Sequence, residues 1–261
     1  LDIYGELVSA IYNTSRFGEE ISEKLWRLVI KIVNYVTKVW TTKDSGIWEV
    51  RSRPQNFVYS KLMCWVALDR GIKIAKLRDK DFVLDTWLVA RDEIKKAILE
   101  KGFSPRLNSF VQSFETEYLD ATGLLIPLMG LLPFDDPKIQ GTVDAVFKEL
   151  LSKDGLVYRY KNDDGLPGRE GAFLLCSFWL VDVLALSGRA EEAERIFSGV
   201  VKHAGPLGLL AEEIDVNSGE MLGNYPQAFS HIGLINSALY LGKAKGRKEI
   251  GPNLVVVNER L

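Results

Sequence analysis

Apolar side chains recur at helical spacing along almost the whole chain, and this periodicity restricts the fold to an all-α class. Alternation with a period of two, which is typical of half-buried strands, is confined to a few residues around 156–160. We therefore expect about nine helices, at residues 3–15, 19–40, 55–76, 81–100, 120–131, 137–151, 169–186, 190–202 and 225–241.

The connections between these helices alternate between tight turns and long loops. Loops as long as these are usually functional. The helix after each long loop is apolar on most sides, whereas the helix after each tight turn is amphipathic. Alternating inner and outer helices predict stacked αα-hairpins that close into an α/α toroid, with the long loops gathered at one end. These loops span residues 41–54, 101–119, 152–168 and 202–224.

Charge and hydropathy exclude several classes of partner. Lys and Arg number 33 against 35 Asp and Glu, so the net charge is −2, and the basic surface of a nucleic-acid-binding protein is not expected. The longest apolar runs, at 124–132 and 172–186, are shorter than the roughly 20 residues of a membrane span, so no membrane partner is expected. Cys64 and Cys176 lie inside apolar segments, which favours buried free thiols over a disulfide or a metal site.

The long loops bring aromatic, arginine and carboxylate side chains together, a combination that suits a sugar. Sugar rings stack on Trp and Tyr, sugar hydroxyls bind charged groups, and two carboxyl groups cleave a glycosidic bond. His203 and His231 lack metal-ligand spacing, so we expect neither a metal ion nor a cofactor. The sequence contains no Gly-x-Ser-x-Gly motif of serine hydrolases and no phosphate-binding glycine motif.

Several blocks of the sequence can be compared with known families. They read Gly-Ile-Trp-Glu-Val-Arg at 46–51, Ser-Lys-Leu-Met-Cys-Trp-Val-Ala-Leu-Asp-Arg at 60–70, Glu-Gly-Ala-Phe-Leu-Leu-Cys-Ser-Phe-Trp at 170–179, Ala-Glu-Glu-Ile-Asp at 211–215, and Leu-Gly-Asn-Tyr-Pro-Gln-Ala-Phe-Ser-His at 222–231. In this order they resemble glycoside hydrolase family 15, and the resemblance covers nearly the whole chain. It implies an (α/α)6 toroid that hydrolyses α-glucosides with inversion at the anomeric carbon.

The resemblance implies catalytic roles for two carboxyl groups. Glu49 matches the general acid, which has to be kept protonated near working pH by an apolar, water-poor setting that Trp48 could help to provide. Glu212 matches the general base, and Glu213 is the runner-up. In an inverting site the two carboxyl groups lie roughly 6.5–9.5 Å apart, so that the attacking water fits between them.

The resemblance also implies sugar contacts. Arg159 and Tyr160 match an Arg-Tyr pair that lines the glucose site, where a guanidinium can hold neighbouring hydroxyls. Glu170 and Trp48 are further candidates for contact with the sugar. No residue is assigned to a metal.

The chain departs from the family in its extent. Family members usually carry an amino-terminal β-sandwich and earlier toroid helices, which are not in this sequence. We therefore expect residues 1–261 to form one incomplete toroid, whose open seam would favour pairing with a missing amino-terminal fragment or a second copy. No secretory leader is present, which favours a cytoplasmic location, although the chain begins with Leu1 and not Met.

Three functions fit these observations. The first is a hydrolase of the glucoamylase type, which releases glucose from the non-reducing ends of α-glucans or maltooligosaccharides. The alternative within the same family is an α,α-trehalase, since the block at 222–231 is of a style found in both prokaryotic branches. The third is an inactive carbohydrate-binding fragment. The sequence by itself leaves all three open.

Overall fold

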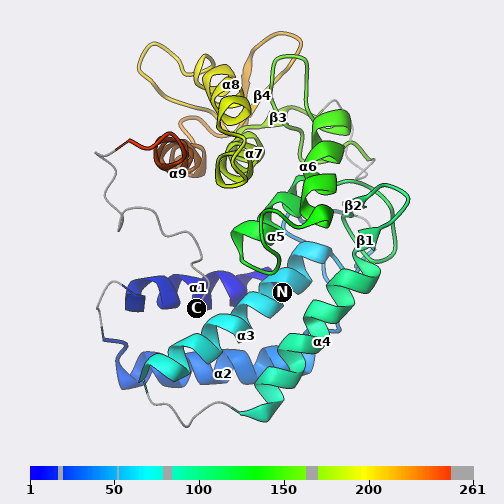
Figure 1. The fold of residues 1–261 in the computed structure, drawn as a ribbon, viewed down its shortest axis with the longest axis vertical. Coiled ribbons are helices and arrows are strands. Elements are labelled where there is room, and N and C mark those ends of the chain that lie inside the picture. The colour runs from blue at the N-terminus through cyan, green and yellow to red at the C-terminus, as the bar shows by residue number, and fades with distance from the viewer. Residues whose placement is uncertain (17–19, 52, 79–83, 163–169, 248–261) are drawn as a thin grey trace. The chain divides into compact units, whose positions relative to one another are not determined.

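The structure, a computed structural model, describes residues 1–16, 20–51, 53–78, 84–162 and 170–247. The chain forms two compact units: unit 1 comprises residues 1–104 and 111–117, and unit 2 comprises residues 105–110 and 118–261. Over the described residues the helices number nine, as predicted (Figure 1). The predicted starts of three helices, at Glu19, Asp81 and Arg169, lie outside the described part. That the whole chain is one domain stays a prediction.

Unit 1 is built around one buried helix, α3. This helix contacts the three other helices of the unit, and from residue 58 to residue 72 every residue on it is buried. Its sequence is apolar on most sides, so it can be stable only where neighbours cover each side. The elements of unit 1 are α1 (Asp2–Arg16), α2 (Glu23–Val39), α3 (Val58–Arg78), α4 (Asp85–Lys101) and the short strand β1 (Phe103–Ser104).

Helices α1 and α3 approach each other closely at a glycine. A Cβ atom on Gly5 would lie 2.2 Å from the carbonyl oxygen of Met63, which is a backbone atom of α3. Rigid backbone cannot move aside as a flexible side chain can, so only glycine fits at this crossing.

We expect Gly5→Ala to lower the free energy of unfolding by about 1–3 kcal/mol, because the added methyl group forces α1 away from α3. Urea-induced unfolding monitored by circular dichroism measures this change. The matched control is Gly199→Ala in a helix of unit 2, where the new Cβ would meet its nearest neighbour at 3.4 Å. That variant should gain up to about 1 kcal/mol from helix propensity. Equal effects of the two substitutions would contradict the close approach.

In its described residues, unit 2 contains five α-helices, a 3₁₀ turn and short strands. The helix predicted at 120–131 is divided into the 3₁₀ turn and a single α-helical turn, because Pro127 has no N–H to donate. Asp120 caps the 3₁₀ turn by accepting from Thr122 N at 2.8 Å. The elements are β2 (Ser109–Phe110), the 3₁₀ turn η1 (Ala121–Leu124), α5 (Leu125–Leu128), α6 (Pro137–Glu149), β3 (Ala172–Phe173), α7 (Leu174–Leu186), α8 (Ala190–Val201), β4 (Glu213–Ile214), β5 (Met221–Leu222) and α9 (Ala228–Ala244).

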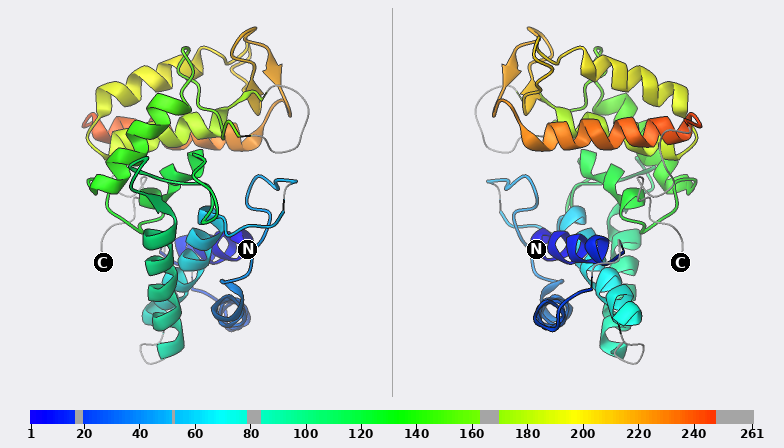
Figure 2. Two further views of the ribbon diagram at one scale, coloured as in Figure 1. Left: turned by 90° about the vertical axis from the view of Figure 1, so that its right-hand side faces the viewer. Right: turned by 90° about the vertical axis from the view of Figure 1, so that its left-hand side faces the viewer.

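Helix α7 is the buried helix of unit 2, and α8 and α9 pack against it (Figure 2). The amphipathic helix α8 buries one stripe, Ala193, Ile196 and Val200, at helical spacing. Helices α7 and α8 thus agree with the predicted alternation of an apolar inner helix and an amphipathic outer helix. Helix α9 differs, because Ile232 and Ile235 are 57% and 58% exposed although the helix is apolar on most sides.

A buried carboxyl group joins α7 to α9. The Oδ1 atom of Asp182 accepts a hydrogen bond of 2.5 Å from the hydroxyl of Ser237, which also lies 3.1 Å from the carbonyl oxygen of Phe178. Burial raises the pKa of Asp182 to about 7, although the bond from Ser237 acts in the opposite direction. The carboxyl group is therefore protonated in the folded state at pH values where it is ionised in the unfolded chain.

This difference predicts that the stability of unit 2 falls as pH rises. Below pH 3.8, the ordinary pKa of an aspartate, the carboxyl group is protonated in both the folded and the unfolded state. Between pH 3.8 and about 7 it is protonated only in the folded state. The free energy of unfolding should therefore decrease by up to about 1.4 kcal/mol per pH unit over this range. Asp182→Asn should remove this contribution, as measured by thermal unfolding at pH 5 and pH 8. An unchanged difference between the two pH values would contradict the assignment.

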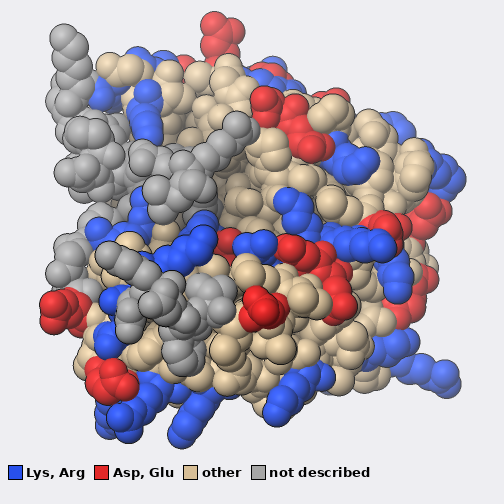
Figure 3. Space-filling model, turned by 60° about the horizontal axis from the view of Figure 1, so that its bottom comes forward, with Lys and Arg blue, Asp and Glu red and all other residues tan. Residues whose placement is uncertain are grey.

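The surface carries charges of both signs. On the face drawn in Figure 3, Lys and Arg side chains are interspersed with Asp and Glu, in keeping with the net charge of −2. Among the described residues, no helix is long and apolar enough to cross a membrane.

Candidate active site

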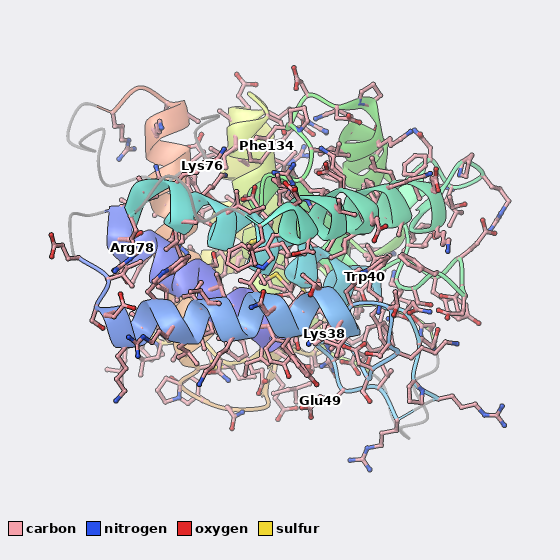
Figure 4. All side chains as sticks on the ribbon, turned by 90° about the horizontal axis from the view of Figure 1, so that it is seen from below. Lys38, Trp40, Glu49, Lys76, Arg78 and Phe134 are labelled. Carbon is pink, nitrogen blue, oxygen red and sulfur yellow. The ribbon has the colours of Figure 1, made fainter. Side chains whose placement is uncertain are left out.

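In unit 1, Glu49 lies in the loop between α2 and α3, and its backbone has an unusual conformation. Its φ angle is +49°, in the left-handed region that residues with a side chain rarely adopt. The turn is closed by hydrogen bonds from Glu49 N to Gly46 O at 3.2 Å and from Val50 N to Ser45 O at 3.1 Å. The Glu49 side chain is exposed, and it is labelled in Figure 4. Strain of this kind clusters at functional sites.

The ends of this loop are tied to each other and to neighbouring segments. Asp44 and Gln55 exchange two backbone hydrogen bonds of 3.0 Å, which bring the two ends together. Gln55 also accepts from the hydroxyl of Ser113 at 2.6 Å. Glu115 accepts from the backbone and side-chain nitrogens of Asn56 at 3.0 and 2.8 Å. The base of the loop is therefore closed and anchored to the segment around residues 113–115.

A buried lysine supports the same base from α3. The side chain of Lys61 is fully buried, and its ammonium group donates to the carbonyl oxygen of Thr42 at 2.5 Å. Burial lowers the pKa of Lys61, although Cys64, Asp44 and Glu115 act in the opposite direction. This carbonyl follows the carboxyl end of α2, where a positive charge is favourable.

We expect Lys61→Met to loosen the loop while it keeps the packing of the aliphatic stem. Losing a charged hydrogen bond should accelerate amide exchange of residues 42–50 by about tenfold. Hydrogen–deuterium exchange read by mass spectrometry measures this rate. The control is Lys76→Met, near the other end of the same helix, where the lysine is exposed (Figure 4). If both variants exchange like the parent chain, Lys61 does not hold the loop.

In unit 2, the candidate residues gather around a small antiparallel sheet. The strand order is β3-β4-β5, and Glu213 on β4 pairs with Phe173 on one side and Leu222 on the other. The backbone of Glu212 continues this arrangement, since its carbonyl accepts from Leu174 N at 3.1 Å and its N–H donates to Asn224 O at 3.0 Å. Successive side chains of an extended segment point to opposite faces, so the two glutamates have different surroundings.

The carboxylate of Glu212 is oriented by one partner. Its Oε2 atom accepts from the backbone N of Asn224 at 3.0 Å and from the side-chain Nδ2 at 2.8 Å. Gly223, with a φ angle of +71°, lies so close that a Cβ atom there would be 2.7 Å from the same oxygen. Within the described residues both hydrogen bonds fall on Oε2, and the half-buried side chain keeps Oε1 for another partner.

The carboxylate of Glu213 faces an arginine instead. The Nη2 atom of Arg159 lies 3.4 Å from Glu213 Oε1 and also pairs with the carboxylate of Glu170. The guanidinium lies over two aromatic rings, 5.5 Å from the centroid of Tyr160 and 5.2 Å from that of Phe173. The side chains of Arg159, Glu170 and Glu213 are mostly buried, with exposed fractions of 19%, 31% and 17%.

Burial raises the pKa of Glu213 to about 7, and the nearby charges of Glu170 and Glu212 act in the same direction. The positive charge of Arg159 and a hydrogen bond from Gly171 N oppose this shift. Glu213 therefore changes charge near neutral pH, which is common at functional sites.

The structure thus brings together some of the predicted residues. Arg159, Glu170, Glu212 and the runner-up Glu213 lie around one sheet. Tyr160 is near them but only 3% exposed, so its ring is better placed to support the guanidinium than to face a sugar. Trp48 and Glu49 are described in unit 1.

Sequence reasoning missed three contributors to these surroundings. Asn224 lies in a block that resembles the family, but no role was predicted for its side chain. The contacts of Gly171 and Gly223 depend on strand pairing, which no periodicity indicates. The Nε2 atom of His231 accepts from Leu210 N at 3.3 Å, and its Nδ1 atom lies 2.7 Å from Gln227 O. In the described part of the chain, no group of three or more His, Cys, Asp or Glu residues could hold a metal ion.

This chain is similar to proteins of one known family. The family described as glycosyl hydrolases family 15 matches residues 1–239. The chain belongs to this family. Its relatives include proteins named trehalase from Mycobacterium tuberculosis, 44% identical over 247 residues, and from Thermoplasma volcanium, 41% identical over 244 residues. Each match covers 94% of this chain but 36% and 39% of the relative, so the chain spans well under half of their length.

Solved structures confirm the predicted fold class. A bacterial glucoamylase in complex with acarbose has a TM-score of 0.77 at 15% identity, over 97% of this chain and 42% of that one. A structure titled as a wild-type glycosidase has a TM-score of 0.74 at 24% identity, over 94% of this chain and 66% of that one. At these identities the likeness shows the fold alone, and it is that of the (α/α)6 toroids of family 15.

Proposed function

We propose that this chain carries the catalytic machinery of an inverting α,α-trehalase. The observation behind the proposal is the similarity, over 94% of the chain, to several relatives that are all named trehalase. This similarity favours the alternative of the sequence analysis over its first reading, a hydrolase of the glucoamylase type. The substrate is then a disaccharide of two glucose units joined through their anomeric carbons.

In this proposal Glu212 is the general base. The two N–H donors of Asn224 fix one carboxylate oxygen, so the other oxygen has a defined direction in which to hold a water molecule. A base has to lie within hydrogen-bond reach of the proton it removes, and a fixed carboxylate meets this requirement. Glu213, the runner-up, is committed to Arg159 and is less suited to this task.

Glu49 is the proposed general acid, which protonates the glycosidic oxygen as the bond breaks. Its side chain is exposed, so we propose that the bound sugar supplies the water-poor surroundings that keep a carboxyl group protonated. The turn at Glu49 defines the backbone position from which this side chain projects, without help from a regular element.

The stereochemistry of the products follows from this mechanism. Water attacks one anomeric carbon from the face opposite the leaving group, so that glucose is released as the β anomer. The other glucose is the leaving group and keeps its α configuration. The initial products are therefore equal amounts of α- and β-glucose, whereas a retaining enzyme yields only the α anomer.

We expect the purified chain to release glucose from trehalose and not from maltotriose, with equal amounts of the two anomers seen by proton NMR. Glu49→Gln and Glu212→Gln should each lower kcat by about 10²- to 10⁴-fold, because each removes a proton-transfer group. A coupled glucose assay measures these rates.

The control is Glu194→Gln on α8, which removes an exposed carboxylate that pairs with Lys245 at 2.6 Å. It should leave the rate unchanged. Release from maltotriose but not from trehalose, or no release from trehalose by the folded chain, would contradict the proposal.

A further inference from the structure

Two carboxylates share the guanidinium of Arg159. Its Nη2 atom contacts both Glu170 and Glu213, and its guanidinium carbon lies over the rings of Tyr160 and Phe173. A guanidinium has five N–H donors in a fixed plane, so partners on one edge determine where the remaining donors point. The two carboxylates can thus set the direction of the donors that they do not use.

The position of Glu213 is itself fixed from three sides. Its backbone is held in the centre of the sheet, between β3 and β5. A Cβ atom on Gly171 would lie 2.9 Å from Glu213 Oε2 and 3.1 Å from its Cβ, so the glycine leaves just enough space for this side chain. Gly171 N also donates to the carboxylate. A side chain held in this way is suited to orient another one.

We propose that Glu213 is a positioning residue, which holds the Arg159 guanidinium in the orientation that binds the sugar hydroxyls. This inference rests on the proposed function, because it takes Arg159 to be a sugar contact. It assigns different tasks to the two neighbouring glutamates: Glu212 acts on water, and Glu213 acts only through the arginine.

The surroundings of Glu213 make this task dependent on pH. The charged groups that face it are Arg159 from the loop after α6, Glu170 from the segment before β3 and Glu212 from its own segment. Cys176 on α7 is also near, and burial keeps its thiol neutral by raising its pKa well above the usual range. Since Glu213 has a pKa of about 7, it loses its charge and its hold on Arg159 as pH falls through neutrality.

The test is Glu213→Gln, which keeps the shape of the side chain and removes its charge. The KM for trehalose should rise about tenfold or more at pH 8, because the ion pair between Glu213 and Arg159 is lost, whereas kcat should stay within about twofold of the parent value. In the parent chain KM should rise as pH falls from 8 to 6, and in the variant KM should not change over this range. Initial rates at several pH values measure both effects.

The matched control is Glu192→Gln, which removes a carboxylate from an arginine elsewhere in unit 2. Glu192 binds Arg189 at 2.6 and 2.9 Å, and its loss should leave KM and its pH dependence unchanged. A second variant, Gly171→Ala, keeps every charge but displaces the Glu213 carboxylate. It should raise KM and retain a pH dependence, and it tests the inference even if Glu213→Gln fails to fold.

Different outcomes separate the failure of this inference from that of the proposed function. An active parent chain whose Glu213→Gln variant has the same KM and pH profile overturns the inference alone. A thousandfold loss of kcat at constant KM also overturns it, because Glu213 would then be the base.

If the parent chain releases no glucose, the proposed function fails. The inference is then decided by nitrogen-15 NMR of the Arg159 Nε–H group, identified by its loss in Arg159→Lys. Its signal should be sharp in the parent chain and in Glu192→Gln, and broadened in Glu213→Gln. A sharp signal in all three overturns the inference.

Discussion

A helix that is apolar on most sides has to be covered by neighbours on those sides, and this constraint organises both units. Helices α3 and α7 meet it by taking three neighbours in unit 1 and by packing against α8 and α9 in unit 2. Most residues of both helices are buried, so their sides are taken up by packing. The functional candidates therefore lie next to the starts of these helices, in the loop before α3 and in the sheet whose first strand leads into α7.

The helices could be predicted from the sequence because a period of 3.6 is strong over ten or more residues. The one helix that was predicted but divided, at 120–131, contains Pro127, whose missing N–H interrupts an otherwise apolar run. The three-stranded sheet could not be predicted, since strands of two residues have no measurable periodicity. Its pairing depends on contacts between residues about 40 positions apart, such as Phe173 and Glu213.

In the candidate site, too, the sequence predicts features that depend on neighbouring residues but not features that depend on tertiary contacts. The resemblance to the family identified Glu49, Arg159 and Glu212, because the residues next to them in the sequence match the family's motifs. It did not reveal that Arg159 shares its guanidinium between two carboxylates, or that Tyr160 is buried beneath it. Burial and charge pairing arise from tertiary packing, and so the pKa of Glu213 could not be derived from its type or position.

The extended backbone at Glu212 and Glu213 also bears on how such chains can vary. Because neighbouring side chains point to opposite faces, a single-residue deletion just before this pair would exchange their surroundings, turning the base towards the arginine. Changes of length in the turn between β4 and β5, by contrast, leave each of the two carboxylates on its own face of the sheet. Viable length variants should therefore accumulate at residues 215–220 and be excluded from the segment that leads into β4.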